Sequence, residues 1–127
     1  MSYTLDRTLP GAEYADVVAR TRAALTAEGF GIPVEMDTRA IFQAKLGKET
    51  DPRVILGACL PAVAFEALAV EPQLAAFLPC NVTVHATAGG VTVSAVDPEV
   101  LFGLTANVDP AHATTVKARL QAALDRI

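Results

Sequence analysis

Two cysteines, an asparagine and a histidine are the residues whose types and spacing favour chemistry in this chain. Cys59 and Cys80 are its only cysteines, and Asn81 and His85 follow the second of them. A thiol pair can bind a soft metal ion, form a reversible disulfide or carry sulfur. The spacing matches neither a CxxC pair nor a Cys/His zinc finger, so two small apolar side chains packed in a core are the competing interpretation.

His85 has two interpretations as well. Its imidazole is a candidate ligand or proton-transfer group. The alternative is an ordinary surface or interface histidine on the polar face of a strand. Asn81, directly after Cys80, is a candidate hydrogen-bonding group beside the thiols.

The elements around the cysteines predict how the thiols are positioned. Residues 54–59 are apolar on both faces, as in a strand inside a sheet. Pro61 suits the first turn of a helix that Pro72 limits, and another strand begins near Cys80. If the two strands pair antiparallel, both cysteines lie at the same end of the sheet.

The rest of the chain supplies three more strands and two long helices. Alternation predicts strands over residues 2–8, 30–36 and 91–96, and helical spacing predicts helices over 12–28 and from Pro110 to the end. Pro33 lacks an N–H, which predicts an edge or irregular strand. A short helix is expected near residue 38, with Asp37 or Thr38 as its cap, and another is expected after Asp97.

These elements indicate one domain over residues 1–127 with an α+β fold. We expect a mainly antiparallel five-stranded sheet, two long helices on one of its faces and short helices inserted between the strands. Within residues 80–87, successive side chains are expected to point to opposite faces of the sheet, with Cys80 on one face and Asn81 on the other. The uncovered face is expected to carry Thr83, His85, Thr92 and Ser94.

Composition excludes some classes of function. The net charge is −4 and no Lys/Arg cluster occurs, which argues against nucleic-acid binding. No apolar run reaches the ~20 residues that span a bilayer, and the first residues lack signal-peptide features, so we expect a cytoplasmic protein with reduced thiols. Apolar residues make up 52% and charged residues only 19%, which favours a surface covered by a second subunit. We identify no paired-carboxylate, Ser/His/Asp or phosphate-loop motif.

Several short motifs resemble one family. They are Ile55-Leu56-Gly57-Ala58-Cys59-Leu60-Pro61, Leu78-Pro79-Cys80-Asn81-Val82 and Ala95-Val96-Asp97-Pro98. With these motifs, residues 12–125 resemble DUF302, a bacterial and archaeal family of small domains of unknown function. The resemblance implies a strand–helix–four-strand–helix domain, similar in outline to half of a TATA-binding protein (TBP) and often homodimeric. It places Cys59, Cys80 and Asn81 on signature positions, and it departs at Leu60, where the family usually has Asn.

Three functions remain open at this point. The first is a homodimeric protein that binds a small ligand or a soft metal ion at a two-cysteine site. The second is a thiol-dependent redox or sulfur-transfer enzyme with one cysteine as nucleophile. The third is a dimerisation or scaffold module whose cysteines only pack. Neither a cofactor nor a specific ligand follows from the sequence.

Overall fold

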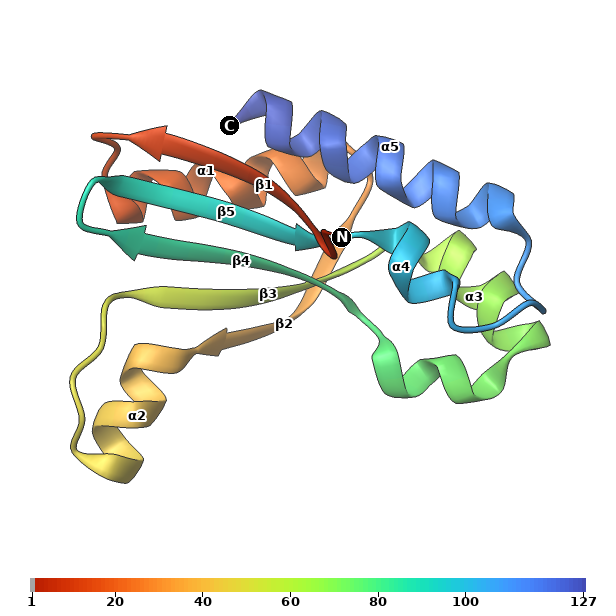
Figure 1. Cartoon of the computed structure of the whole chain (residues 1–127), viewed down its shortest axis with the longest axis horizontal. Coiled ribbons are helices and arrows are strands. Elements are labelled where there is room, and N and C mark those ends of the chain that lie inside the picture. The colour runs from red at the N-terminus through yellow and green to blue at the C-terminus, as the bar shows by residue number, and fades with distance from the viewer. Residues whose placement is uncertain (1) are drawn as a thin grey trace.

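The chain, described over residues 2–127 in a computed structural model, has five strands, five α-helices and one 3-10 helix (Figure 1). In order these are β1 (Thr4–Pro10), α1 (Tyr14–Ala27), β2 (Gly31–Asp37), α2 (Thr38–Leu46), β3 (Arg53–Cys59), α3 (Pro61–Val70), η1 (Pro72–Phe77), β4 (Cys80–Thr87), β5 (Gly90–Val96), α4 (Pro98–Phe102) and α5 (Pro110–Arg126).

The strands form one antiparallel sheet in the order β1-β5-β4-β3-β2. The two long helices, α1 and α5, pack against each other and against the same face of this sheet. The predicted fold class is therefore confirmed, as is the interior position of β3. Strand β2 lies at an edge, and its register shifts between Gly31 and Val34, on either side of Pro33.

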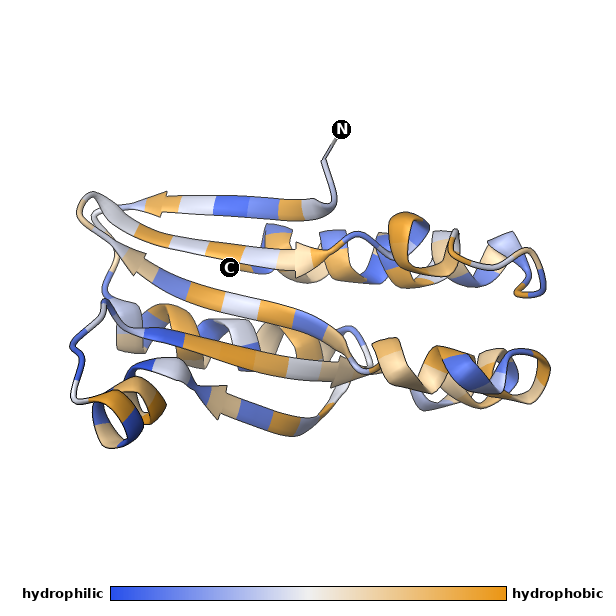
Figure 2. Cartoon of the chain, turned by 60° about the horizontal axis from the view of Figure 1, so that its bottom comes forward, coloured by the Kyte–Doolittle hydropathy of each residue, from blue (hydrophilic) through white to orange (hydrophobic). Residues whose placement is uncertain are grey.

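The core lies between the sheet and the two long helices. Strand side chains alternate between the two faces, and Figure 2 shows this as alternating hydrophilic and hydrophobic residues along the strands. Val82 and Val84 of β4 point inward, where they share the core with Leu25 of α1 and Leu120 of α5. The opposite face is open and carries Thr83, His85, Thr92 and Ser94 at intermediate exposure, as expected.

Caps explain where several helices begin and end. The Asp37 carboxylate accepts a hydrogen bond from the Ala40 N–H at the start of α2, and Asp97 accepts one from Glu99 at the start of α4. Gly47 ends α2 in the left-handed region with φ of 63°. The segment between α3 and β4 forms the 3-10 helix η1. Within residues 2–127, no helix combines the length and the apolar character needed to cross a membrane.

Candidate functional site

Cys59 and Cys80 meet at one end of the sheet. Strands β3 and β4 pair antiparallel with Ala58 opposite Cys80, so Cys59 lies one residue beyond that pair. Both cysteines are free thiols; Cys80 is buried and Cys59 is half-buried. Their placement at the same end confirms the expected strand pairing.

Both cysteines line a cavity of about 290 Å³ beyond this end of the sheet. Its wall is apolar apart from the backbone and the two thiols. It is built from the β2, β3 and β4 ends together with α3, α4 and α5. The lining residues are Phe30, Pro33, Ala58, Cys59, Leu60, Val63, Ala64, Leu68, Leu78, Pro79, Cys80, Phe102 and Val116.

The two thiols differ in their environment. Burial, and to a smaller extent the charge of a Cys59 thiolate nearby, together raise the pKa of Cys80 to about 11. A buried thiol of this kind stays protonated at neutral pH and behaves as a small apolar group with a polarisable sulfur. The cavity therefore presents a soft, neutral surface at Cys80 and a partly exposed sulfur at Cys59.

Gly57 lets the cavity wall approach β3 closely. It lies opposite Asn81 on β4 and Val34 on β2. A Cβ added at Gly57 would lie 2.5 Å from Cγ of Pro79 and 3.1 Å from Cβ of Val34. Only glycine leaves room for the Pro79 ring, which follows a cis peptide bond and lines the cavity beside Cys80.

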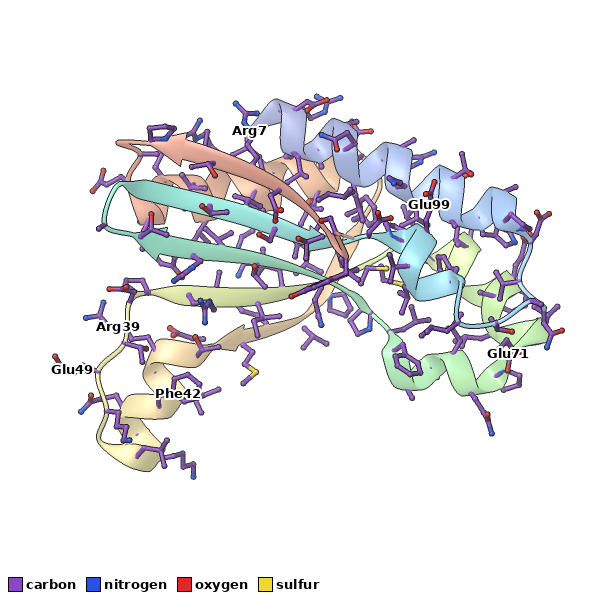
Figure 3. The ribbon with its side chains drawn as sticks, viewed as in Figure 1. Arg7, Arg39, Phe42, Glu49, Glu71 and Glu99 are labelled. Carbon is purple, nitrogen blue, oxygen red and sulfur yellow. The ribbon has the colours of Figure 1, made fainter. Side chains whose placement is uncertain are left out.

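Polar contacts hold the helical part of the wall together. The Glu71 carboxylate, at the end of α3, accepts hydrogen bonds from Thr105 Oγ1 at 2.8 Å and from Asn107 Nδ2 at 2.7 Å. Figure 3 shows Glu71 at the turn between α3 and η1. The bonds from Asn107 and Thr105 lower the pKa of Glu71 because they favour its charged form. This contact joins α3 to the loop between α4 and α5.

Two further contacts converge on α5. Lys117 Nζ lies 3.2 Å from a carboxylate oxygen of both Asp97 and Glu99, and Figure 3 shows Glu99 between α4 and α5. The bonds to Asp97 and Glu99 raise the pKa of Lys117. His112 Nε2 lies 3.1 Å from Glu66 on α3. Helices α3 and α4 are thus both joined to α5 by side-chain contacts around the cavity.

Asn81 and His85 lie elsewhere. Both belong to the open face of β4, Asn81 exposed and His85 at intermediate exposure, and neither lines the cavity. The structure therefore brings Cys59 and Cys80 together and leaves Asn81 and His85 outside their cavity. Over the described chain, no group of three or more His, Cys, Asp or Glu side chains is arranged to hold a metal ion.

Sequence reasoning missed two parts of this region. One is Arg53, which lies opposite His85 on the open face with its Nη2 about 3.1 Å from His85 Nε2. Counting from Cys59 backward along β3 and from Cys80 forward along β4 would have placed Arg53 within one residue of His85. The other is the apolar wall itself, whose members come from segments far apart in the sequence.

The fold and the cavity together define a class of protein: a small α+β domain with an open antiparallel sheet and an apolar two-thiol cavity at its end. Comparison with known proteins assigns the family. Residues 5–127 match the "Domain of unknown function DUF302", and the chain belongs to this family. The crystal structure of an uncharacterized conserved DUF302 protein from Bacillus stearothermophilus is similar with a TM-score of 0.85 at 26% identity, covering 99% of this chain and 98% of the other. No curated protein matches the chain.

Proposed function

We propose that this chain is a binding protein for a small apolar molecule, held in the cavity beside Cys59 and Cys80. The observation that carries the proposal is the cavity, whose lining side chains are apolar apart from the two thiols. Its volume of about 290 Å³ is at the lower end of the range for small-molecule sites. Transfer of apolar ligand surface from water into such a wall supplies the affinity.

The lining also limits the chemistry of the ligand. Among the side chains in the wall there is no Lys, Arg, Asp, Glu or His. A charged ligand would lose its hydration there without a partner, at a cost of several kcal/mol. A neutral ligand avoids this desolvation cost, and a polarisable ligand gains from contact with the two sulfur atoms. A soft metal ion would find only these two sulfurs as side-chain ligands in the wall.

The first test of the proposal uses a neutral apolar probe. N-phenyl-1-naphthylamine should bind the wild-type protein at one saturable site with increased fluorescence. Ala64→Phe places a ring in the cavity and should weaken binding by about tenfold or more, because the ring occupies the ligand volume. Ala62→Phe is the matched control: it lies on the same helix, is exposed and does not line the cavity.

The two variants also define what contradicts the proposal. Equal probe binding by Ala64→Phe and Ala62→Phe would show that the probe does not occupy the cavity. Native mass spectrometry of protein purified without reductant or chelator then identifies any natural occupant. The difference between the native mass and the denatured mass gives the mass of the bound molecule.

A second candidate function is a reversible disulfide between Cys59 and Cys80. It is favoured by the placement of both free thiols in one wall, with Cys59 close enough to influence the pKa of Cys80. In this reaction the two thiols give two electrons and two protons to oxidised glutathione, which leaves as two reduced molecules. The denatured mass would fall by two hydrogens, with the new bond mapped to Cys59 and Cys80.

The proposal includes a homodimer. Large exposed apolar side chains support it. Four of them lie on the consecutive elements β2 and α2, and we call these four the β2–α2 patch: Val34, Met36, Ile41 and Leu46. The first two lie on the edge strand and the other two on the helix that follows. The bulge and Pro33 hinder pairing of this edge with another strand, so we expect packing of side chains rather than sheet extension.

Sedimentation velocity tests the dimer. The wild-type protein should sediment as a dimer at high concentration. Met36→Glu should raise the dissociation constant by about tenfold or more, because the interface would then bury an unpaired charge. Phe65→Ser removes an exposed apolar side chain from α3, outside the β2–α2 patch, and should leave the dimer intact. A wild-type monomer at high concentration contradicts the expected dimer.

A further inference from the structure

The open face of the sheet carries a cation in an unusual contact. Arg53 on β3 and His85 on β4 are direct cross-strand partners. Arg53 Nη2 lies 3.2 Å from Nδ1 and 3.1 Å from Nε2 of His85, so the guanidinium contacts both ring nitrogens. Both side chains are partly buried at this contact. The pair is therefore held in place on the sheet surface and does not extend freely into solvent.

This contact leaves most of the hydrogen-bonding capacity of Arg53 unused. A guanidinium has five N–H donors and no acceptor, whereas a neutral imidazole accepts at one nitrogen only. His85 can therefore accept one hydrogen bond from Arg53, and a protonated His85 can accept none. The ion pairs within residues 2–127 do not include Arg53. No carboxylate of the described residues therefore forms an ion pair with this cation.

Hydroxyl groups continue the same row across the sheet. Thr92 on β5 lies opposite His85, and Thr8 on β1 lies opposite Thr92, with 3.4 Å between the two Oγ1 atoms. On the other side, the Thr38 hydroxyl donates to the Arg53 carbonyl and fixes the backbone of the cation. A guanidinium, an imidazole and a hydroxyl therefore stand side by side on three adjacent strands, all able to donate hydrogen bonds.

The charge of the row itself, and not that of its surroundings, favours an anion. The chain as a whole has a net charge of −4, yet the row contains a cation and no acidic residue. Asp6, which shares the open face, lies in the neighbouring row on edge strand β1, opposite Ser94. Charge-assisted hydrogen bonds from a planar guanidinium suit the geometry of oxyanions, which can accept two of them at once.

We propose that Arg53, His85 and Thr92 form a binding site for a small oxyanion group on the open face of the sheet. Arg53 supplies the charge and two parallel N–H donors. His85 holds the guanidinium on the sheet and adds a donor from its own ring, and Thr92 adds a hydroxyl. The ligand class is a sulfate, phosphate or carboxylate group. This site is separate from the cavity and does not depend on the function proposed for it.

A titration with sodium sulfate, followed by ¹H–¹⁵N NMR, tests the site. Sulfate stays doubly charged across the working pH range, so its own protonation does not enter the result. At constant ionic strength, the amides around Arg53, His85 and Thr92 should shift and saturate. Arg53→Gln should weaken sulfate binding by about tenfold or more, because a charge-assisted bidentate contact is lost. Lys45→Gln is the matched control, since it removes one positive charge from an exposed position on α2.

Titrations with other salts distinguish a specific oxyanion site from a general electrostatic attraction of anions. Sodium chloride replacing sulfate should give no saturable shift at these residues. Phosphate and acetate titrations then distinguish a tetrahedral anion from a carboxylate as the preferred group, and either preference supports the site. Equal binding of sulfate and chloride, or equal loss in Arg53→Gln and Lys45→Gln, would overturn it. The ¹H–¹⁵N spectrum of each variant shows whether the fold is retained.

Discussion

Iodoacetamide at neutral pH should alkylate Cys59 about 100-fold faster than Cys80. Cys80 is only 6% exposed, and burial raises its pKa to about 11. At pH 7 this corresponds to roughly one thiolate in 10⁴ Cys80 side chains, whereas an ordinary thiol with a pKa of 9.0 has about one in 100. Because only the thiolate is a nucleophile, both its scarcity and its lack of access slow Cys80.

Peptide mapping by mass spectrometry over a time course measures the two rates. Cys59→Ala leaves Cys80 as the remaining thiol, and its slow modification should persist in that variant. The rate at Cys80 should rise about tenfold for each pH unit between 8 and 10, since the thiolate fraction grows in that proportion below the pKa. Similar rates for the two cysteines at pH 7 would show that Cys80 is open to solvent.

The same pKa shift has a defined effect on stability. The ordinary thiol value is 9.0, and the value in the folded chain is about 11. Between these two pH values the unfolded chain holds fewer protons at Cys80 than the folded chain does. The contribution of Cys80 to stability is therefore complete below pH 9 and is lost as the pH rises toward 11. In a redox role, Cys59 would be the attacking thiol and Cys80 the resolving one.

Gly57→Ala should destabilise the fold by about 1–3 kcal/mol. The new methyl group would meet the Pro79 ring on one side and Val34 on the other, and both belong to strands or strand ends held by pairing. In a chain of this size that loss lowers the melting temperature by roughly 3–6 °C per kcal/mol. Because Pro79 lines the cavity, displacement of its ring should also weaken binding of the apolar probe.

Gly31→Ala provides the matched control for this prediction. Gly31 lies on the neighbouring strand β2, and a Cβ there would meet only the Cys59 carbonyl oxygen, at an ordinary 3.9 Å. Its effect on the free energy of unfolding should stay within about 0.5 kcal/mol. Thermal unfolding followed by circular dichroism compares the two. If both variants lost the same stability, close packing at Gly57 would not be the cause.

Much of the fold could be predicted from the sequence because local signals agreed with one another. The apolar run at residues 54–59 indicated an interior strand, and Pro33 indicated an edge; both follow from hydrogen-bond and burial rules that act on single strands. The same rules placed Cys59 and Cys80 at one end of the sheet, since antiparallel strands joined through a helix bring those ends together.

The details of the site depend on tertiary packing, which the sequence patterns did not reveal. The cavity exists because Phe30, Phe102 and Val116, from three distant segments, leave space between them, and no periodic pattern records such a space. Asn81 is different, because the alternation of β4 already placed it on the face opposite Cys80. Because Asn81 is next to Cys80 in sequence, we expected it to lie beside the thiols. Neighbouring residues of a strand, however, point to opposite faces of the sheet.

Helix α3 has a consequence for the exchange of any occupant of the cavity. Of its ten residues, only Ala67 is fully buried. Val63 and Leu68 pack against the core while partly exposed, and polar contacts of Glu66 and of Glu71, just after the helix, add to this attachment. Central strands β4 and β5, by contrast, bury alternate side chains along their length. Detachment of α3 therefore costs less free energy than global unfolding. For the apolar ligand that we propose, we therefore expect entry and release by opening of this helix while the sheet stays intact.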